Sequence, residues 1–245
     1  MKILQQQSGL SRRKSRDLIE EGEVKVEGSE IKNPFEQYDL DKIETISLRG
    51  HPLATSPPEL RAYKYYKPTG VLCSHDDPHY GRTLGRILRS EGFIGYRWAG
   101  RLDQDAEGLI LLTNDGDLVH SLTHPKFEVE KRYHLWLSNN LSRKRVKEKI
   151  SKMENGIKDK DDLLQAKRGE ILELSNTHCE IRIILTEGKK HELKRMCERT
   201  DLNIMRLRRT AIGPIELGNI SPEDISRVSE NEWEELKNFR KETTE

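Results

Sequence analysis

The stretch GRLDQDAEGLILLTNDG, residues 100–116, places one acidic residue, Asp103, on a bend between two apolar segments. Apolar and polar residues alternate over residues 96–102, and this period predicts a half-buried strand. A second apolar run covers residues 109–112, and the turn residues 114–116 close it. A carboxylate on a bend between two core strands is held rigidly and can face a cleft. Asp103 is therefore a candidate catalytic acid.

The length of the chain, 245 residues, is enough for one large domain and one small one. Its apolar runs are far shorter than the ~20 residues that a membrane-spanning helix needs, and MKILQQQSGL lacks the apolar core of a signal peptide. Three widely spaced cysteines, Cys73, Cys179 and Cys197, argue against a disulfide framework and against a zinc site of paired cysteines. Nothing in the sequence demands a partner subunit. We therefore expect a monomer in the reducing cytoplasm, without membrane contact.

The formal net charge of +1 hides a segregation of charge along the chain. Residues 182–209 contain nine Lys or Arg and four Asp or Glu, whereas residues 221–245 contain four bases and eight acids. This pattern predicts a basic face that binds phosphates and an acidic tail that points away from it. The alternative is that both segments are ordinary solvated helix faces.

Composition and turn residues divide the chain into four parts. We expect a small module over residues 1–52, a linker over 53–60, a long catalytic segment over 61–222 and an acidic helical tail over 223–245. The linker contains Ser56-Pro57-Pro58, and consecutive prolines disfavour both helix and central strand.

The long segment has more predicted strands than helices. Periodicity predicts strands over residues 63–66, 71–74, 96–102, 109–112, 131–137, 180–185 and 204–212, and helices over 83–88, 142–153 and 189–199. Many strands with few intervening helices favour an antiparallel or mixed sheet over a doubly wound one. The predicted fold class is therefore α+β.

In the first module, Ser11 is placed to cap a helix that runs to Glu21, and a short strand is predicted over residues 23–27. Four cations lie in the first turns of this helix: Arg12, Arg13, Lys14 and Arg16. Cations are unfavourable at a helix N-terminus unless an anion compensates, and a phosphate backbone would do so. The alternative is a charged helical hairpin without a ligand.

The segment GLSRRKSRDLIEEGEVKVEG resembles the small RNA-binding module first described in ribosomal protein S four. The resemblance lies in a Ser-Arg-Arg helix start, a Gly-X-Val turn and a valine strand. It departs from that family at its start, because residues 1–7 offer only Ile3 and Leu4 as core residues. The first helix of the module is therefore expected either to be short or to begin upstream.

Four further segments occur in the order and spacing of the ribosomal RNA pseudouridine synthases of the RsuA-like family, which carry such an N-terminal module. They are YKPTGVLCS from Tyr66, GRLDQDAEGLILLTNDG from Gly100, EKRYHLWL from Glu130, and EGKKHELKRM followed by RLRRTAIGPIEL. The resemblance covers nearly the entire chain. It implies a mixed-sheet catalytic domain that isomerises a uridine of ribosomal RNA, in free RNA or in a pre-ribosomal particle, with the large subunit as the commoner substrate.

The resemblance assigns roles residue by residue. Asp103 matches the essential aspartate, Arg101 the arginine that holds the target nucleotide out of its stack, and Tyr133 the ring that stacks on the uracil. Lys194 matches the basic residue that pairs with the aspartate, and Leu185 lies in the strand that lines the base pocket. Together with the charge pattern, the resemblance implies RNA contacts by Arg12, Arg13, Lys14, Arg16, Lys189, Lys190, Arg195 and Arg208.

Such a small set of residues is sufficient for the implied chemistry. The reaction breaks the bond from the sugar to the base nitrogen, turns the uracil, and forms a bond to its carbon five. One carboxylate can act as a nucleophile or as a base, and one cation can keep it ionised. No metal and no cofactor are implied. Flipping the nucleotide costs a few kcal/mol, which stacking on an aromatic ring and phosphate contacts can offset.

Three other functions were considered. Asp103 and Asp105 could form a glycoside hydrolase pair, although such carboxylates usually lie on separate strands. His75 with His79, or His120 with His124, could begin a metal site, but neither pair has a third ligand at suitable spacing. A ribosome-assembly factor that binds RNA without converting it is the serious rival.

Ala106 departs from the family, whose members commonly carry Thr or Ser three residues after the aspartate. The missing hydroxyl is expected to remove about one hydrogen bond, worth roughly 1 kcal/mol. From sequence alone, Ala106→Ser is therefore expected to be active and at least as stable as the wild type.

Overall fold

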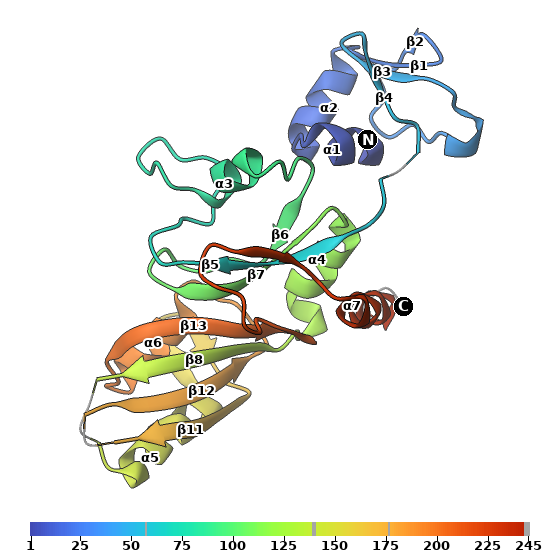
Figure 1. The fold of residues 1–245 in the computed structure, drawn as a ribbon. Coiled ribbons are helices and arrows are strands. Elements are labelled where there is room, and N and C mark those ends of the chain that lie inside the picture. The colour runs from blue at the N-terminus through green and yellow to red at the C-terminus, as the bar shows by residue number, and fades with distance from the viewer. Residues whose placement is uncertain (57, 139–140, 176, 243–245) are drawn as a thin grey trace.

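The structure is a computed structural model that describes residues 1–56, 58–138, 141–175 and 177–242 (Figure 1). A small sheet with two helices lies at one end of the molecule, and a large mixed sheet forms the rest (Figure 1). Among the residues described, no helix is both long and apolar enough to cross a membrane.

Two helices and four short strands form the N-terminal part. They are α1 (Lys2–Ser8), α2 (Arg12–Glu20), β1 (Val24–Val26), β2 (Ser29–Glu30), β3 (Ile46–Leu48) and β4 (His51–Leu53). The order of the strands across the sheet is β2-β1-β3-β4. A 3-10 turn, η1 (Leu40–Lys42), lies between β2 and β3. Ser11 caps α2 as predicted, since its Oγ accepts from the Lys14 amide at 3.1 Å. The first helix of the module is present and short, with seven residues. Its two apolar residues, Ile3 and Leu4, pack in the apolar clusters of this part.

The large sheet has the strand order β11-β12-β8-β13-β7-β5-β15. Its strands are β11 (Arg168–Leu174), β12 (Cys179–Leu185), β8 (Lys131–Leu137), β13 (Ile204–Ile212), β7 (Glu107–Thr113), β5 (Ala62–Lys67) and β15 (Ile225–Arg227), with β6 (Arg97–Ala99) paired to β7 and β14 (Ile215–Glu216) to β13. All pairs are antiparallel except β7 with β13, so the sheet is mixed and the α+β prediction is confirmed.

The parallel pair β7 and β13 lies in the middle of the sheet. Its register joins Arg208 to Glu107 and Arg209 to Gly108, whereas β8 and β12 are in register over seven residue pairs. Gly108 permits this approach, because a Cβ there would lie 2.3 Å from the Arg209 carbonyl oxygen. The sheet therefore consists of two antiparallel halves that meet at one short contact.

Helices cover the two halves differently (Figure 1). The helices α5 (Arg143–Asn155) and α6 (Glu192–Arg199) pack on one face of β8, β12 and β11, together with the hairpin β9 (Ile157–Asp159) and β10 (Asp162–Leu164). The other half carries α3 (Leu84–Ser90), α4 (Gly116–Thr123) with the 3-10 turn η2 (Pro125–Phe127), and α7 (Glu230–Glu242). One apolar cluster runs across both halves, from α5 and α6 along β8, β12 and β7 to α3. A second cluster lies between β5, β7 and the helices α4 and α7.

Four sequence expectations differ from the structure. Residues 71–74 do not continue a strand, because Leu72 pairs only with the loop before α3, through a bridge to Thr83. The strand expected over 96–102 ends at Ala99, where the bend that carries Asp103 begins. The helix expected from Lys189 starts at Glu192, because His191 takes a left-handed φ of 52°. The expected helical tail from residue 223 begins instead with β15, which hydrogen-bonds to β5.

Candidate active site

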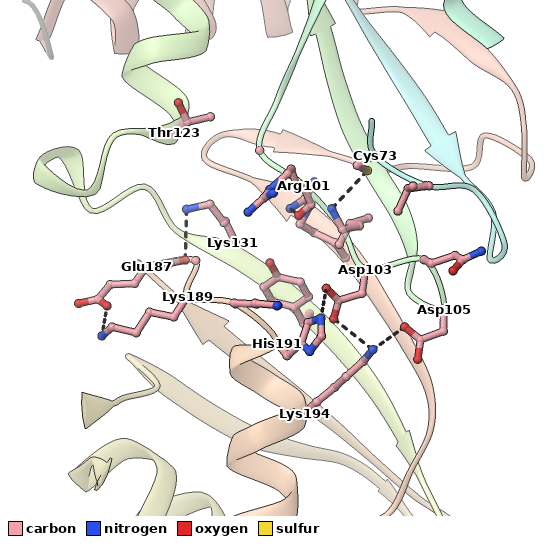
Figure 2. Close-up of a pocket in the computed structure, with 18 of the residues that line it drawn as sticks. Cys73, Arg101, Asp103, Asp105, Thr123, Lys131, Glu187, Lys189, His191 and Lys194 are labelled. Atoms are coloured by element: carbon pink, nitrogen blue, oxygen red, sulfur yellow. Dashed lines mark hydrogen bonds and ion pairs between the residues drawn. The ribbon is translucent and has the colours of Figure 1, made fainter. Parts of the chain in front are cut away.

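A cavity of about 1180 Å³ lies where the two halves of the large sheet meet. The bend between β6 and β7 forms one wall with Arg101, Asp103 and Asp105. The opposite wall comes from β8, the loop of residues 186–191, α6 and β13 (Figure 2). Residues of both halves thus face one cavity.

Asp103 faces an ammonium group across this cavity (Figure 2). Lys194 Nζ lies 3.1 Å from Asp103 Oδ2 and 2.5 Å from Asp105 Oδ1. Burial alone would lower the pKa of Lys194, but its hydrogen bonds to Asp105 and Asp103 outweigh burial and raise it. Lys194 is therefore charged at neutral pH and is a direct cationic partner of both carboxylates. His191 Nε2 also approaches Asp103 Oδ1, at 3.5 Å.

The bend itself is held from beneath by Lys67, at the end of β5. Lys67 is fully buried, and its Nζ donates to the carbonyl oxygens of Ala106 at 2.7 Å, Pro68 at 2.9 Å and Gln104 at 3.3 Å. Burial lowers the pKa of Lys67 to about 8. One ammonium thus holds two carbonyls of the bend, those of Gln104 and Ala106, together with the carbonyl of Pro68, and this fixes the bend relative to β5.

The aromatic and apolar residues expected in the site also lie there. Tyr133, on β8, lines the cavity, and Leu185, on β12, lines an adjoining hollow that Asp103 and Tyr133 share. Both side chains point to the same face of the sheet, because they follow the alternating burial of β8 and β12. The structure therefore brings Asp103, Arg101, Tyr133 and Lys194 into one cavity, with Leu185 beside it.

The residues expected to contact RNA do not all lie together. Lys189 and Lys190 line the cavity. Arg195 instead binds Asp159 and Asp162, at 2.5 and 2.7 Å, and Arg208 binds Glu107 at 2.7 Å. These two arginines are held by acidic neighbours that the sequence order did not reveal.

Within the N-terminal part, the four expected RNA contacts also separate. Arg16 pairs with Glu20 at 2.7 Å. Arg12, Arg13 and Lys14 are exposed and form no ion pair with any residue in the described ranges. The free cations of α2 are therefore those of its first turn.

Sequence reasoning missed two buried cations in the cavity wall, Lys131 and Arg209. Arg209 is 1% exposed, and it donates to the carbonyl oxygens of Leu109 at 2.8 Å and Arg101 at 3.2 Å. Burial, followed by the charge of Arg209, lowers the pKa of Lys131 to about 8. A signal was present, because each cation occupies the inward-facing phase of its strand, where an apolar residue is expected.

The described residues contain a group of three side chains of metal-ligand type, but it includes none of the histidines that the sequence suggested. Glu173, His178 and Glu180 have ligand atoms within 4.8 Å of one another at the hairpin of β11 and β12. The His120 and His124 rings lie against each other with centroids 4.9 Å apart. The paired carboxylates of the hydrolase alternative, Asp103 and Asp105, share the one ammonium of Lys194.

Comparison with known proteins identifies the family. A model of the RNA pseudouridylate synthase family matches residues 63–199, which is more than half of the chain. The chain belongs to this family. The matched range includes β5, the bend with Asp103, β8 and α6.

The alignments with similar proteins span nearly the full length of this pseudouridine synthase. An RNA pseudouridine synthase of Aquifex aeolicus (strain VF5), itself named as uncharacterized, is 32% identical over 98% of this chain and 96% of its own. The ribosomal large subunit pseudouridine synthase B of Yersinia pestis is 30% identical over 96% of this chain and 71% of its own. The ribosomal small subunit pseudouridine synthase A of Vibrio cholerae (serotype O1, strain ATCC 39315 / El Tor Inaba N16961) is 28% identical over 91% and 93%.

A solved structure confirms the fold. The crystal structure of a pseudouridylate synthase matches with a TM-score of 0.63 and 25% identity, and the match covers 96% of this chain and 97% of that one. The resemblance inferred from four sequence segments is therefore confirmed as membership of the pseudouridine synthase family.

Proposed function

We propose that this pseudouridine synthase isomerises a uridine of ribosomal RNA, with large-subunit RNA as its substrate and Asp103 as the catalytic carboxylate. The observation that carries the proposal is the position of Asp103, between the Lys194 ammonium and the cavity that Tyr133 lines. Relatives named for the ribosomal subunits support ribosomal RNA as the substrate class.

Asp103 supplies the one group that the reaction needs from the protein. As an ionised carboxylate it attacks the sugar carbon that bears the base, or removes the proton from the neighbouring sugar carbon. Either step releases the base nitrogen from the sugar while the uracil stays in the cavity. After the uracil turns, its carbon five bonds to the sugar carbon. In the first route this step displaces the Asp103 carboxylate, and in the second the carboxyl group returns its proton to the neighbouring sugar carbon. Carbon five then loses its hydrogen to solvent, and the base nitrogen gains one.

Lys194 and Tyr133 complete this proposal. The ammonium of Lys194 lies 3.1 Å from Asp103 Oδ2 and holds this carboxylate in place before the RNA binds. The ring of Tyr133 offers a stacking surface for the flipped uracil, and Leu185 extends the apolar wall beside it. Arg101, exposed at the mouth of the cavity, is placed to occupy the space that the flipped nucleotide leaves.

The N-terminal part is proposed to be a separate RNA-binding module over residues 1–52, joined through residues 53–60 to a catalytic domain over 61–222. Its resemblance to the module of ribosomal protein S four and the unpaired cations Arg12, Arg13 and Lys14 support this assignment. Phosphates at the start of α2 would compensate a helix N-terminus that carries three cations and no acid.

The decisive measurement is tritium release from unmodified ribosomal RNA labelled at carbon five of uridine. We expect the wild type to release tritium from large-subunit RNA and Asp103→Asn to release none. Asp105→Asn is the matched control, because it also contacts Lys194 but is exposed. It should retain most of the activity.

Three results would contradict parts of the proposal. Release from small-subunit RNA alone would replace the substrate. Activity of Asp103→Asn with loss in Asp105→Asn would exchange the catalytic residue. Tight binding of both RNAs, and of partly assembled subunits, without any release would favour the assembly factor.

A further inference from the structure

Helix α5 carries a strong positive charge that the site does not use. Its sequence, RKRVKEKISKMEN, contains six Lys or Arg and two Glu. Val146, Ile150 and Met153 bury one side of the helix against the sheet. The cations therefore lie on its outer sides.

Within the described part of the chain, most of these cations have no acidic partner. Lys149 contacts Asp201 at 3.5 Å. The other five form no ion pair with any residue that the structure describes: Arg143, Lys144, Arg145, Lys147 and Lys152. Elsewhere exposed cations are commonly paired, as Arg86 is with Asp76 and Arg132 with Glu216. Among the residues described, helix α5 thus gathers five unpaired cations on one element, two more than the first turn of α2.

The start of α5 repeats the start of α2. Ser142 caps α5 as Ser11 caps α2, and the Oγ of each accepts from the amide three residues later. Three cations follow each serine, and neither first turn contains an acid. Such cations oppose the helix dipole, and an anion at the helix start would compensate them. The two helices therefore offer the same arrangement to an anion.

Helix α5 packs beside α6, one of the elements that form the wall of the cavity. It packs on the same face of the sheet as α6, which carries Lys194, and Lys149 Nζ donates to the Thr200 carbonyl at the end of α6. In Figure 1, α5 and the helix pair α1 and α2 lie at opposite ends of the molecule. An open hollow of about 760 Å³ runs along the outer side of α5. Four cations, one acid and two neutral residues line it: Arg143, Lys144, Lys147, Lys152, Glu148, Ser151 and Asn155.

We propose that the outer face of α5 binds the phosphate backbone of the RNA whose uridine enters the cavity. This inference rests on the proposed function, and it adds a second RNA contact at the end of the molecule opposite α2. Unpaired Lys and Arg release counterions when they neutralise phosphates, and Ser151 and Asn155 supply neutral donors for phosphate oxygens. From Lys144 to Lys152 the helix rises about 12 Å, so the surface spans several phosphates.

The test compares two triple variants in the Asp103→Asn background, so that RNA is not converted during the measurement. One is Lys144→Gln, Lys147→Gln, Lys152→Gln, and the other replaces the same three lysines with Arg. Lys, Gln and Arg have similar helix propensities, so α5 should remain folded in both. Thermal unfolding of each variant checks this. Affinity for unmodified large-subunit RNA is measured between 50 and 200 mM salt.

We expect the Gln variant to bind more weakly and to lose about 0.9 from the slope of log affinity against log salt for each duplex phosphate contact removed. The Arg variant should keep the wild-type slope, because it keeps the charge. An unchanged slope in a folded Gln variant would overturn the inference. So would equal losses in both variants, since charge would then not be the cause.

The slope is read without any turnover, so it separates the two proposals. Tritium release by the wild type together with an unchanged Gln slope overturns only the role of α5. A reduced slope in a protein that releases no tritium from either RNA supports the RNA surface on α5 and contradicts the proposed function.

Discussion

At the scale of single residues, burial acts to lower the pKa of both Lys194 and Lys67, but their hydrogen-bond partners differ. Lys194 has carboxylate partners, and its pKa is raised despite burial. Lys67 has only carbonyl oxygens as direct partners, and burial lowers its pKa to about 8. Lys194 is therefore a stable positive charge, whereas Lys67 titrates a little above neutral pH.

The lowered pKa of Lys67 predicts a pH dependence of stability. A lysine with a pKa of about 8 in the folded protein and about 10.5 in the unfolded chain costs folding free energy below pH 8. This cost is relieved as the pH rises from about 8 to 10.5, where the unfolded state binds more protons. The wild type should therefore gain up to about 3 kcal/mol relative to Lys67→Met between pH 7 and 10. Denaturant unfolding of both proteins at each pH measures the difference, and a constant difference would contradict it.

Ala106 is buried, and this changes the expectation from sequence for Ala106→Ser. Its side chain is 1% exposed and packs in an apolar cluster with Leu102 and Tyr133. A hydroxyl there without an acceptor costs about 1–3 kcal/mol. We now expect Ala106→Ser to release tritium at a rate near that of the wild type but to unfold at lower denaturant. An unfolding midpoint equal to or above that of the wild type would show that the hydroxyl finds a partner.

Motif spacing in the sequence could predict residues that share the site. It could not predict which cations are unavailable to RNA because they form ion pairs in the folded protein. Sequence predicted that Asp103 and Tyr133 share a site because each lies in a segment of specific order and pattern, and both line one cavity in the structure. Arg195 and Arg208 were predicted to contact RNA, but they form ion pairs with Asp159 and Glu107. The sequence did not reveal these pairs, because the acidic partners lie far away in the chain. Charge counts along a chain cannot show which cations are already neutralised.

At the scale of elements, the strands with regular alternation were predicted best. The bounds of β8 and β13 agree with the predicted ranges, because one face of each strand is buried and the other is polar. Residues 71–74 have no such alternation, and Leu72 pairs with the loop before α3 through a single bridge. Alternation shows that one side is buried without showing what lies next to it.

Helix α2 carries the prediction for the N-terminal module. Replacing Arg12, Arg13 and Lys14 with Gln should weaken RNA binding and lower its salt slope by up to about three contacts' worth. Arg16→Gln is the control, because Arg16 is already paired with Glu20. Filter binding at several salt concentrations measures both. Equal slopes for the triple variant and the wild type would place the RNA elsewhere.

At the scale of the whole molecule, α1 docks on the loop before β6. The Gln5 side chain accepts from Arg97 Nη2 at 2.5 Å, and Gln6 Nε2 donates to the Asn114 carbonyl at 3.3 Å. Gly95 permits this contact, because a Cβ there would lie 2.1 Å from the Gln6 carbonyl oxygen. The two parts of the molecule thus meet backbone to backbone.

Gly95→Ala should separate these parts. Its methyl group cannot be accommodated without a shift of α1, so we expect a drop in the free energy of unfolding beyond the ~1 kcal/mol of a strained alanine. Gly92→Ala isolates the strain, because Gly92 has a similar φ of 76° and a Cβ there meets nothing within 4 Å. Thermal unfolding of both variants measures the difference, and equal losses would show that the docking contributes nothing.

The short contact between β7 and β13 has a consequence for the geometry of catalysis. Asp103 is attached to one half of the sheet, and Tyr133 and Lys194 are attached to the other. Side chains reinforce the contact, since Arg206 and Arg208 each bind Glu107 at 2.7 Å and Arg209 binds the Leu109 carbonyl at 2.8 Å. The guanidinium groups of Arg206, Arg208 and Arg209 therefore help to fix the distance between the Asp103 carboxylate and the Tyr133 ring, although none of the three is proposed to take part in the reaction.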